Sequence, residues 1–249
     1  MKLAAILACR NQSSRLYAKP LQNLDVKSAV SILDYLVAQL KMCSEINDIV
    51  LAVSDRQENA VYKSKSILYG VGYVEGDDRD VLRRLIAGAE SVGADHVFRV
   101  TTESPFPFLD NLAQVYEQHQ RQQLDYSGLK ALPDGASYQI IRLEALKRAW
   151  KEGGQKHRSE YSTLYIMENQ DQFNIVQHDV PTLLQRPKDI RLTVDWPEDL
   201  IVMREIYQGI ALHPSKRLSL YEVIEFLDKN PKINTVNNWI DSGKGRAWY

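Results

Sequence analysis

Three cations lie within ten residues near the start of the chain, and their spacing is typical of a site for phosphate groups. Arg10, Arg15 and Lys19 are separated by polar residues that include Ser13 and Ser14. Guanidinium and ammonium groups neutralise phosphate charge, and hydroxyl and backbone N–H groups add hydrogen-bond donors. An ordinary basic loop would have a similar composition. We favour phosphate binding because this loop directly follows an apolar run.

Two carboxylates, Glu103 and Asp195, occupy corresponding places later in the chain, because each follows a run that predicts a strand. If these strands neighbour the first one in a parallel sheet, both carboxylates lie above the basic loop. Carboxylate oxygens beside a triphosphate are the usual protein ligands of Mg²⁺. A helix cap at Asp195 and a solvated loop at Glu103 are the competing interpretations. Taken together with the cationic loop, the two residues favour a metal site.

The elements that must position these residues alternate regularly in the first half of the chain. The apolar run at 3–8 predicts a strand buried on both faces, and 48–53 and 96–100 predict two more. Helices are expected over 29–42, capped by Ser28, over 56–68, and from 81 onward. Strands and helices joined by short connections predict a Rossmann-like, doubly wound α/β fold. Its sheet is mostly parallel, with helices on both faces.

The second half is less regular. The expected helices span 109–122, 143–152, 159–168, 197–207 and 219–228, and the expected strands span 125–130, 173–177 and 191–194. No repeat, low-complexity stretch or linker divides the chain. We therefore predict one domain over 1–249, in which about 132–180 is less regular.

Composition excludes several classes of function. The net charge is −1, which gives no global basic field for nucleic acid or membrane surfaces. No apolar stretch has the length of a membrane span and no signal-peptide pattern is present, so a cytoplasmic location is expected. Cys9 and Cys43 are far apart and the five histidines are scattered, which argues against a disulfide or a zinc site. Cys9 is expected to be a buried small residue rather than a nucleophile.

Two further polar clusters have competing interpretations. Residues 76–84 are acidic and basic in alternation, which superficially resembles the acidic metal motif of glycosyltransferases; a capped helix with solvated charges explains most of the pattern. Residues 157–160, His-Arg-Ser-Glu, lie where a helix is expected to begin. They would suit an anionic acceptor or a solvated helix end equally well.

These motifs together resemble the cytidylyltransferases of acylneuraminate and 3-deoxy-manno-octulosonate, and most of all the spore-coat polysaccharide type. The basic loop resembles the family signature, and Gly76 with residues 80–83 is similar to its "G…DVL.R" segment. Residues 99–105 resemble its "R-T-x-D-x-P" loop and 133–135 its "P-x-G" turn. Residues 157–160 lie where it has an "REH" cluster, and 192–199 fit its "LTVD…ED" ending. The basic loop and these five further motifs occur in the family's order and cover nearly the whole chain.

The resemblance implies a fold of the nucleotide-diphospho-sugar transferase type and transfer of CMP from CTP to a sugar-like acceptor in surface-glycan synthesis. It implies that 1–249 is a single nucleotidyltransferase domain, in which about 132–180 serves acceptor binding or dimerisation. It also implies Mg²⁺ as cofactor, a homodimer, and the following roles. Arg10, Arg15 and Lys19 are catalytic; Ala8, Arg10, Asn11, Ser13, Ser14, Arg15, Lys19, Asp80 and Arg83 bind the nucleotide; His157, Arg158 and Glu160 bind the acceptor; Glu103 and Asp195 bind the metal.

The chain departs from the family pattern at two places. The loop has Gln12, Ser13 and Ser14 where the family usually has a glycine, and Glu103 stands where it usually has Asp. Both changes are compatible with a different triphosphate or acceptor, or with loss of activity. The alternatives are therefore GTP or UTP with a sugar 1-phosphate, glycosyl transfer, and nucleotide binding without catalysis. The aromatic segment 237–249 is expected to dock on its own chain or on a partner.

Overall fold

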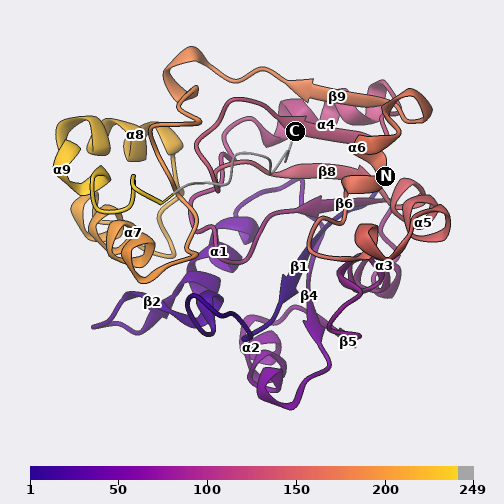
Figure 1. Ribbon diagram of the computed structural model, residues 1–249, viewed down its shortest axis with the longest axis horizontal. Helices are drawn as coiled ribbons and strands as arrows, with labels where there is room; N and C mark the ends of the chain where they lie inside the picture. Colours follow the sequence, from indigo (N-terminus) through magenta and orange to yellow (C-terminus); the bar gives the residue numbers. More distant parts are fainter. Residues whose placement is uncertain (241–249) are drawn as a thin grey trace.

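A seven-stranded sheet in the order β5-β4-β1-β6-β8-β7-β9 forms the centre of the protein (Figure 1). The computed structural model describes residues 1–240. The strands are β1 Leu3–Cys9, β4 Asp48–Ser54, β5 Gly72–Gly76, β6 His96–Arg99, β7 Tyr126–Leu129, β8 Gln139–Arg142 and β9 Ile175–His178. Neighbouring strands are parallel except where β8 pairs with β6 and β7. The predicted α/β fold with a mostly parallel sheet is confirmed.

Strand β1 is the point at which the strand order reverses. From β1 the chain continues to β4 and β5 on one side and then returns to β6 on the other. In open α/β sheets, ligands bind outside the carboxyl ends of the strands at such a reversal. The strand is also buried on both faces, because Leu3, Ala5 and Leu7 belong to one core and Ala4 and Ile6 to the other.

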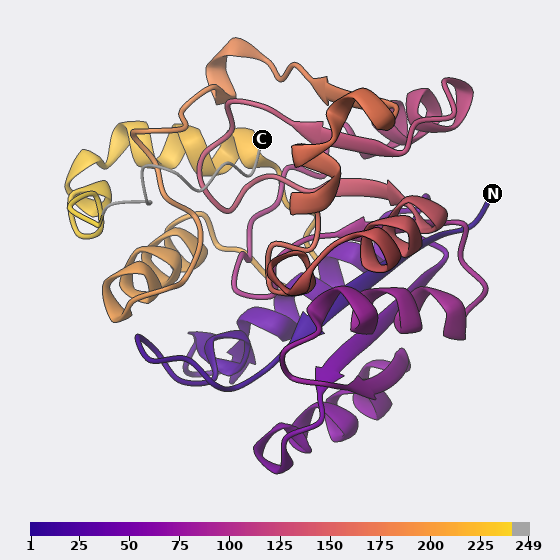
Figure 2. The same ribbon diagram turned by 45° about the vertical axis from the view of Figure 1, so that its right-hand side comes forward.

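Helices cover both faces of the sheet (Figure 1, Figure 2). One core receives side chains of α1 Ile32–Lys41, α2 Val61–Tyr69, α4 Leu112–Arg121, α7 Pro197–Gly209 and α8 Leu220–Lys229, and α9 Pro231–Asn234 packs against it. The other core receives side chains of α3 Val81–Ser91, α5 Leu143–Glu152 and α6 Leu164–Glu168. Each long helix carries an apolar stripe at three- and four-residue spacing, which buries one face and leaves the other in water.

The first helix begins later than predicted, because Ser31 rather than Ser28 is its N-cap. The Ser31 hydroxyl accepts from the Asp34 N–H at 3.1 Å, and the Asp34 carboxylate accepts from the Ser31 N–H at 2.8 Å. The preceding residues form an unpredicted hairpin of β2 Asn23–Asp25 and β3 Val30–Ser31. Ser28 lies between its strands, where its hydroxyl donates to Asp25. Both serines are good capping residues, so sequence alone did not distinguish them.

The second half differs from the prediction at three places. Strand β8 was not predicted, and 191–194 is not a strand, since only Arg191 forms an isolated bridge with Asp134. The backbone of this segment pairs with two loops: Leu192 N–H donates to the Asp134 carbonyl at 2.7 Å, and Val194 N–H donates to the Glu103 carbonyl at 3.0 Å. Helix α6 begins at Leu164 instead of 159, after a 3₁₀ turn at Gln155–Arg158.

Candidate active site

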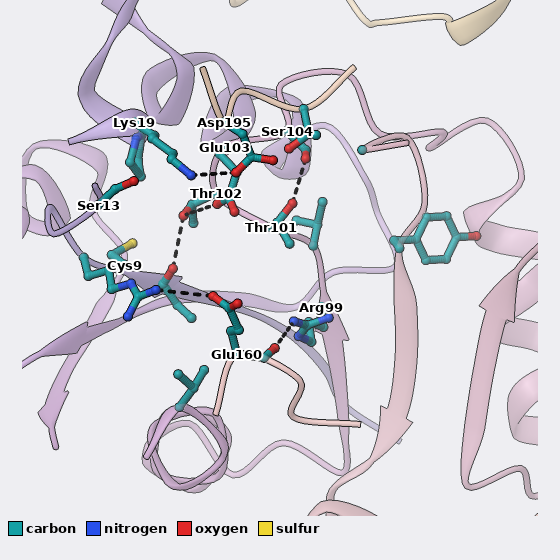
Figure 3. A pocket seen from close by; sticks show the side chains of 18 of the residues that line it. Cys9, Ser13, Lys19, Arg99, Thr101, Thr102, Glu103, Ser104, Glu160 and Asp195 are labelled. Carbon is teal, nitrogen blue, oxygen red and sulfur yellow. Dashed lines mark hydrogen bonds and ion pairs between the residues drawn. The ribbon is translucent and has the colours of Figure 1, made fainter. Parts of the chain in front are cut away.

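A cavity of about 350 Å³ opens at the carboxyl ends of β1 and β6 (Figure 3). Its wall combines the basic loop, the start of α3, the loop after β6, the turn 133–135 and the segment before α7. The polar and charged residues of the wall include Arg10, Asn11, Gln12, Ser13, Ser14, Arg15, Lys19, Arg84, Arg99, Thr101, Thr102, Glu103, Ser104, Asp134, Gln139, Glu160, Thr193 and Asp195, with Ala8 beside them. The cavity therefore lies where the strand order reverses.

The basic loop is fixed by two asparagines rather than by glycine. Asn11 donates its N–H to Asn59 Oδ1 at 2.8 Å and its Nδ2 to the Glu58 carbonyl at 2.6 Å. The Asn11 carbonyl accepts from the Ala18 N–H at 2.8 Å. Ala18 adopts a left-handed φ of 51°, the conformation that usually favours glycine. The loop thus closes without the glycine that the family usually has.

Three cationic side chains bind the two carboxylate oxygens of Asp195. Oδ1 accepts from Arg15 Nη2 at 2.6 Å and from Lys19 Nζ at 2.7 Å, and Oδ2 accepts from Arg191 Nη2 at 2.5 Å. The Lys19 contact is visible in Figure 3. Burial opposes ionisation of Asp195, but the hydrogen bond from Lys19 and the charges of Lys19, Arg15 and Arg191 outweigh it and lower the pKa. Asp195 is therefore a carboxylate at neutral pH.

Glu103 lies next to Asp195, because the Val194 N–H donates to the Glu103 carbonyl. Burial raises the pKa of the Glu103 carboxyl; the charge of Lys19 lowers it and that of Asp195 raises it. The side-chain partner of this carboxylate is the Thr102 hydroxyl, at 3.4 Å. A half-buried carboxylate with so little compensation suits a bound cation.

The pair of carboxylates fits a magnesium ion. Mg²⁺ is bound through one or two carboxylates together with phosphate oxygens and water. Among residues 1–240, no group of three or more His, Cys, Asp or Glu side chains is placed to hold a metal alone. A Mg²⁺ ion bound by these two carboxylates would take its remaining ligands from substrate and solvent.

Glu160 brings a separate segment to the cavity. Its carboxylate is 3.3 Å from Arg10 Nη2, and its carbonyl accepts from Arg99 Nη2 at 2.9 Å. Arg99 also donates to Gln139 Oε1 at 2.9 Å. Glu160 is thus the one predicted acceptor residue of the three that lines the cavity, and its contacts connect the basic loop with β6 and β8.

Arg84 is a cavity cation that sequence reasoning missed. It is 2% exposed and donates from Nη1 to the carbonyls of Cys9, at 3.3 Å, and Ala52, at 3.0 Å. Its buried Nε has no hydrogen-bond partner among the described residues. Burial lowers the pKa of its guanidinium. The signal was the helical register, since Arg84 follows Val81 by three residues and shares its face.

Four predicted ligand contacts lie outside the cavity wall, and three of them surround Trp150. Asp80 caps α3, accepting from the Arg83 N–H at 2.8 Å, and also accepts from the Trp150 indole at 2.8 Å. The guanidinium carbons of Arg158 and Arg83 lie 4.9 and 5.8 Å from the centre of the Trp150 ring. We call Asp80, Arg83, Trp150 and Arg158 the Trp150 cluster. It joins α3, α5 and the turn before Glu160.

The fourth, His157, is buried near this cluster. Its Nε2 is 2.8 Å from Glu168 Oε2, and its Nδ1 accepts from the Gly154 N–H at 2.8 Å. The acidic run 76–78 is also engaged elsewhere, because Asp78 binds the Ser54 hydroxyl and Arg56, each at 2.8 Å. Burial raises the pKa of the Cys9 thiol far above its ordinary value, so a thiolate does not form at neutral pH.

The fold and this arrangement of charges define a nucleotidyltransferase. Residues 4–226 match the family model described as Cytidylyltransferase. The chain belongs to the cytidylyltransferase family, and the resemblance found in its motifs is confirmed. No helix within residues 1–240 has the length and apolar character to cross a membrane.

Two curated relatives align along nearly their whole length. An uncharacterised protein of Methanocaldococcus jannaschii, MJ1063, is 30% identical over 239 residues, which is 96% of this chain and 95% of the relative. The spore coat polysaccharide biosynthesis protein SpsF of Bacillus subtilis is 26% identical over 240 residues, which is 92% of this chain and 95% of SpsF.

Solved structures share the fold. A cytidylyltransferase from Leptospira borgpetersenii superposes with a TM-score of 0.83 at 20% identity, covering 94% of this chain and 96% of its own. A CMP:2-keto-3-deoxy-manno-octonic acid synthetase complexed with CTP superposes with a TM-score of 0.63 at 15% identity, covering 84% and 99%.

Proposed function

We propose that this protein transfers CMP from CTP to a hydroxyl group of an acidic or phosphorylated sugar-like acceptor, with Mg²⁺ as cofactor. The observation that carries the proposal is the junction at Asp195. There two cations of the basic loop, Arg15 and Lys19, meet two neighbouring carboxylates, Asp195 and Glu103, on one cavity wall. The name of SpsF, a relative, supports a role for the proposed reaction in the synthesis of surface polysaccharide.

The transfer needs positioning and charge stabilisation rather than a protein nucleophile. An acceptor oxygen attacks the α-phosphorus, an O–P bond forms, the bond to the bridging oxygen breaks, and pyrophosphate leaves while the acceptor proton passes to solvent. Negative charge spreads over the phosphate oxygens during this step, and fixed cations stabilise it. Arg10, Arg15 and Lys19 supply those cations in the proposal.

Glu103 and Asp195 would hold Mg²⁺ in this reaction. When bound, the ion polarises phosphate oxygens and offsets their charge. Asp195 also orients Arg15 and Lys19, so the same carboxylate would fix both the metal and the phosphate cations. Glu103 retains two carboxylate oxygens and keeps the charge that its usual counterpart, Asp, would supply.

The wall formed by α3 suits a nucleobase. Val81 and Leu85 offer apolar surface for a flat ring, and Arg84 offers the unpartnered Nε donor. Cytosine has two adjacent acceptors, O2 and N3, for such a donor. We therefore assign the base to this wall, and the acceptor to the part of the cavity lined by Glu160 and Gln139.

A homodimer is part of the proposal. Strand β9 is an edge of the sheet within the region expected to dimerise. Unpaired edge backbone is a template for pairing with another chain. Sedimentation velocity of the purified protein checks this element, and a monomer at all concentrations would contradict it.

Calorimetric titration of CTP, GTP, UTP and ATP, with and without Mg²⁺, tests the proposed function. We expect metal-dependent preference for CTP that Arg15→Ala abolishes and Arg83→Ala, outside the cavity, leaves within about threefold. A release assay for pyrophosphate then screens acceptors. Preference for GTP or UTP would move the assignment to sugar 1-phosphate acceptors. Binding without pyrophosphate release from any acceptor would favour a binding protein.

A further inference from the structure

A buried guanidinium lies behind the carboxylate of Asp195. Arg191 is 8% exposed and does not line the cavity. Its Nε contacts Asp199 Oδ1 at 3.0 Å, its Nη1 contacts Asp134 Oδ2 at 2.5 Å, and its Nη2 contacts Asp195 Oδ2 at 2.5 Å. The planar fork of an arginine suits several carboxylates at fixed angles, whereas an ammonium group does not. One side chain therefore connects three separate acidic residues.

The two oxygens of Asp195 face different surroundings as a result. Oδ1 binds Arg15 and Lys19, which line the cavity, and Oδ2 binds Arg191, which does not. A hydrogen bond to one carboxylate oxygen restricts rotation of the group about its Cβ–Cγ bond. Arg191 therefore fixes the orientation of the Asp195 carboxylate, so that one of its two equivalent oxygens faces the cavity.

Asp199 anchors Arg191 from the opposite side. It is fully buried, and its carboxylate accepts from the backbone N–H groups of Asp195 and Trp196, each at 2.9 Å. Asn237 Nδ2 donates to the same carboxylate at 3.0 Å and to the Arg191 carbonyl at 3.3 Å. Asn237 lies beyond the segment that matches the family model, so the C-terminal part of this chain supports the same group.

The turn 133–135 is pressed against the Arg191 segment. Gly135 has a φ of 87°, and a Cβ there would lie 2.7 Å from the backbone of Leu192. Only glycine permits this approach, which brings the Asp134 carbonyl within 2.7 Å of the Leu192 N–H. Asp134 and Gly135 also line the cavity. The contact between Arg191 and Asp134 therefore joins two walls of the cavity.

We propose that Arg191 is a positioning residue for nucleotidyl transfer. It holds Asp195 Oδ2 so that Oδ1 faces the phosphate and metal region, and it keeps the turn 133–135 against the same carboxylate. This inference rests on the proposed function. Partners of metal ligands commonly matter nearly as much as the ligands, because they fix ligand orientation.

Arg191→Lys tests the inference, because it conserves the charge beside Asp195 and removes the three-way geometry. The experiment titrates Mg²⁺ at a fixed CTP concentration by calorimetry on the full chain, and records the unfolding temperature of each variant. We expect the Mg²⁺ concentration for half-maximal CTP binding to rise about tenfold or more in Arg191→Lys. CTP affinity without Mg²⁺ should stay within about threefold.

Two further variants separate positioning from stability. Leu146→Ala, in the core beneath α5, lowers the unfolding temperature without touching the cavity, and its Mg²⁺ requirement should equal that of the wild type. Asp199→Asn weakens the anchor of Arg191 and should shift the Mg²⁺ requirement in the same direction by a smaller factor. It also serves if Arg191→Lys does not fold.

The outcomes are distinguishable. Wild-type protein without metal-dependent CTP binding would overturn the proposed function and this inference with it. Metal-dependent binding in the wild type, together with a Mg²⁺ requirement within twofold in folded Arg191→Lys or Asp199→Asn, would overturn the positioning role and leave the proposed function intact.

Discussion

The basic loop and the Trp150 cluster both contain charged side chains, but only those of the basic loop line the cavity. The loop after β1 directs Arg10, Arg15 and Lys19 toward the cavity. In the Trp150 cluster, Asp80 instead accepts a hydrogen bond from the Trp150 indole. The guanidinium groups of Arg83 and Arg158 lie over the same ring. Each group follows a strand, but β1 lies in the middle of the sheet and β5, which precedes Asp80, lies at its edge.

The difference teaches that a charged loop predicts a site best when it follows a strand at which the order reverses, because ligands bind outside the carboxyl ends of the strands there. The segment after the edge strand β5 contributes Arg84 to the cavity wall, but not Asp80 or Arg83. The Trp150 cluster still serves the cavity, because it fixes α3, which carries Arg84, to the segment that carries Glu160. Its contribution is to the stability of the wall.

The largest expected effect is loss of a cation in the basic loop. Lys19→Met removes the ammonium group that contacts Asp195 and, in the proposal, the triphosphate. Removing one preorganised donor from a site of developing charge costs about 10²- to 10³-fold in kcat. Pyrophosphate release from CTP measures it, with the surface variant Lys147→Met as control. A kcat within threefold of wild type would contradict the role of the loop.

A second prediction separates pH effects on stability from pH effects on the site. The buried rings of His96 and His119 lie edge to face with 4.8 Å between their centres, and no histidine of residues 1–240 lines the cavity. Burial lowers the pKa of His96 to about 4 and, with the neighbouring charges of His96, Arg142 and His178, that of His119 to about 3. Both rings are therefore neutral in the folded protein.

These lowered pKa values make the protein less stable at acidic pH. In the unfolded chain, both histidines bind protons at the ordinary pKa of about 6.5. The free energy of unfolding is therefore highest above that pH and decreases as the pH falls toward the lowered pKa values of the folded protein. Each histidine lowers the free energy of unfolding by about 1.4 kcal/mol per pH unit in this range. Urea unfolding at pH 7 to 5 measures the slope, and His119→Gln should reduce it. An unchanged slope in that variant would refute the assignment.

A smaller effect is expected in the Trp150 cluster. Asp80→Ala removes the cap of α3 and the acceptor of the Trp150 indole. Loss of such a cap lowers the free energy of unfolding by about 1 kcal/mol. Denaturant unfolding measures this loss, and CTP affinity should stay within about threefold. A loss of CTP binding comparable to that of Arg15→Ala would place Asp80 with the basic loop.

The smallest effect is expected for Arg83→Met. Its guanidinium is half exposed, and its contacts are the Trp150 ring and Glu90. Exposed cation–π and ion pairs contribute about 1 kcal/mol or less. We expect a small change in unfolding temperature and wild-type CTP affinity. The paired variant Arg84→Met, one residue further along α3, should weaken CTP binding by about tenfold or more, because it removes the charged donor that the proposal assigns to the base. Equal behaviour of the two variants would refute the assignment of the base to this wall.

The sequence predicted the parts of the site that depend on one strand and the loop after it. The buried run at 3–8 identified β1, and the cations behind it line the cavity as expected. The neighbouring positions of Glu103 and Asp195 also followed from the strand pattern, although 191–194 is not a strand. The apolar residues of 191–194, Leu192 and Val194, are buried in one core of the protein. The backbone N–H groups of this segment bind two loops rather than a neighbouring strand.

What the sequence by itself determined is the alternation of buried strands and amphipathic helices, and with it the family, since local periodicity and motif order are written in neighbouring residues. The tertiary structure decided which of two adjacent arginines, Arg83 or Arg84, faces the cavity. It also decided that the charges near Trp150 bind each other and that Arg191 stands behind Asp195. These outcomes depend on contacts between residues far apart in the chain, such as Arg191 with Asp134 and Trp150 with Asp80, which no local pattern encodes.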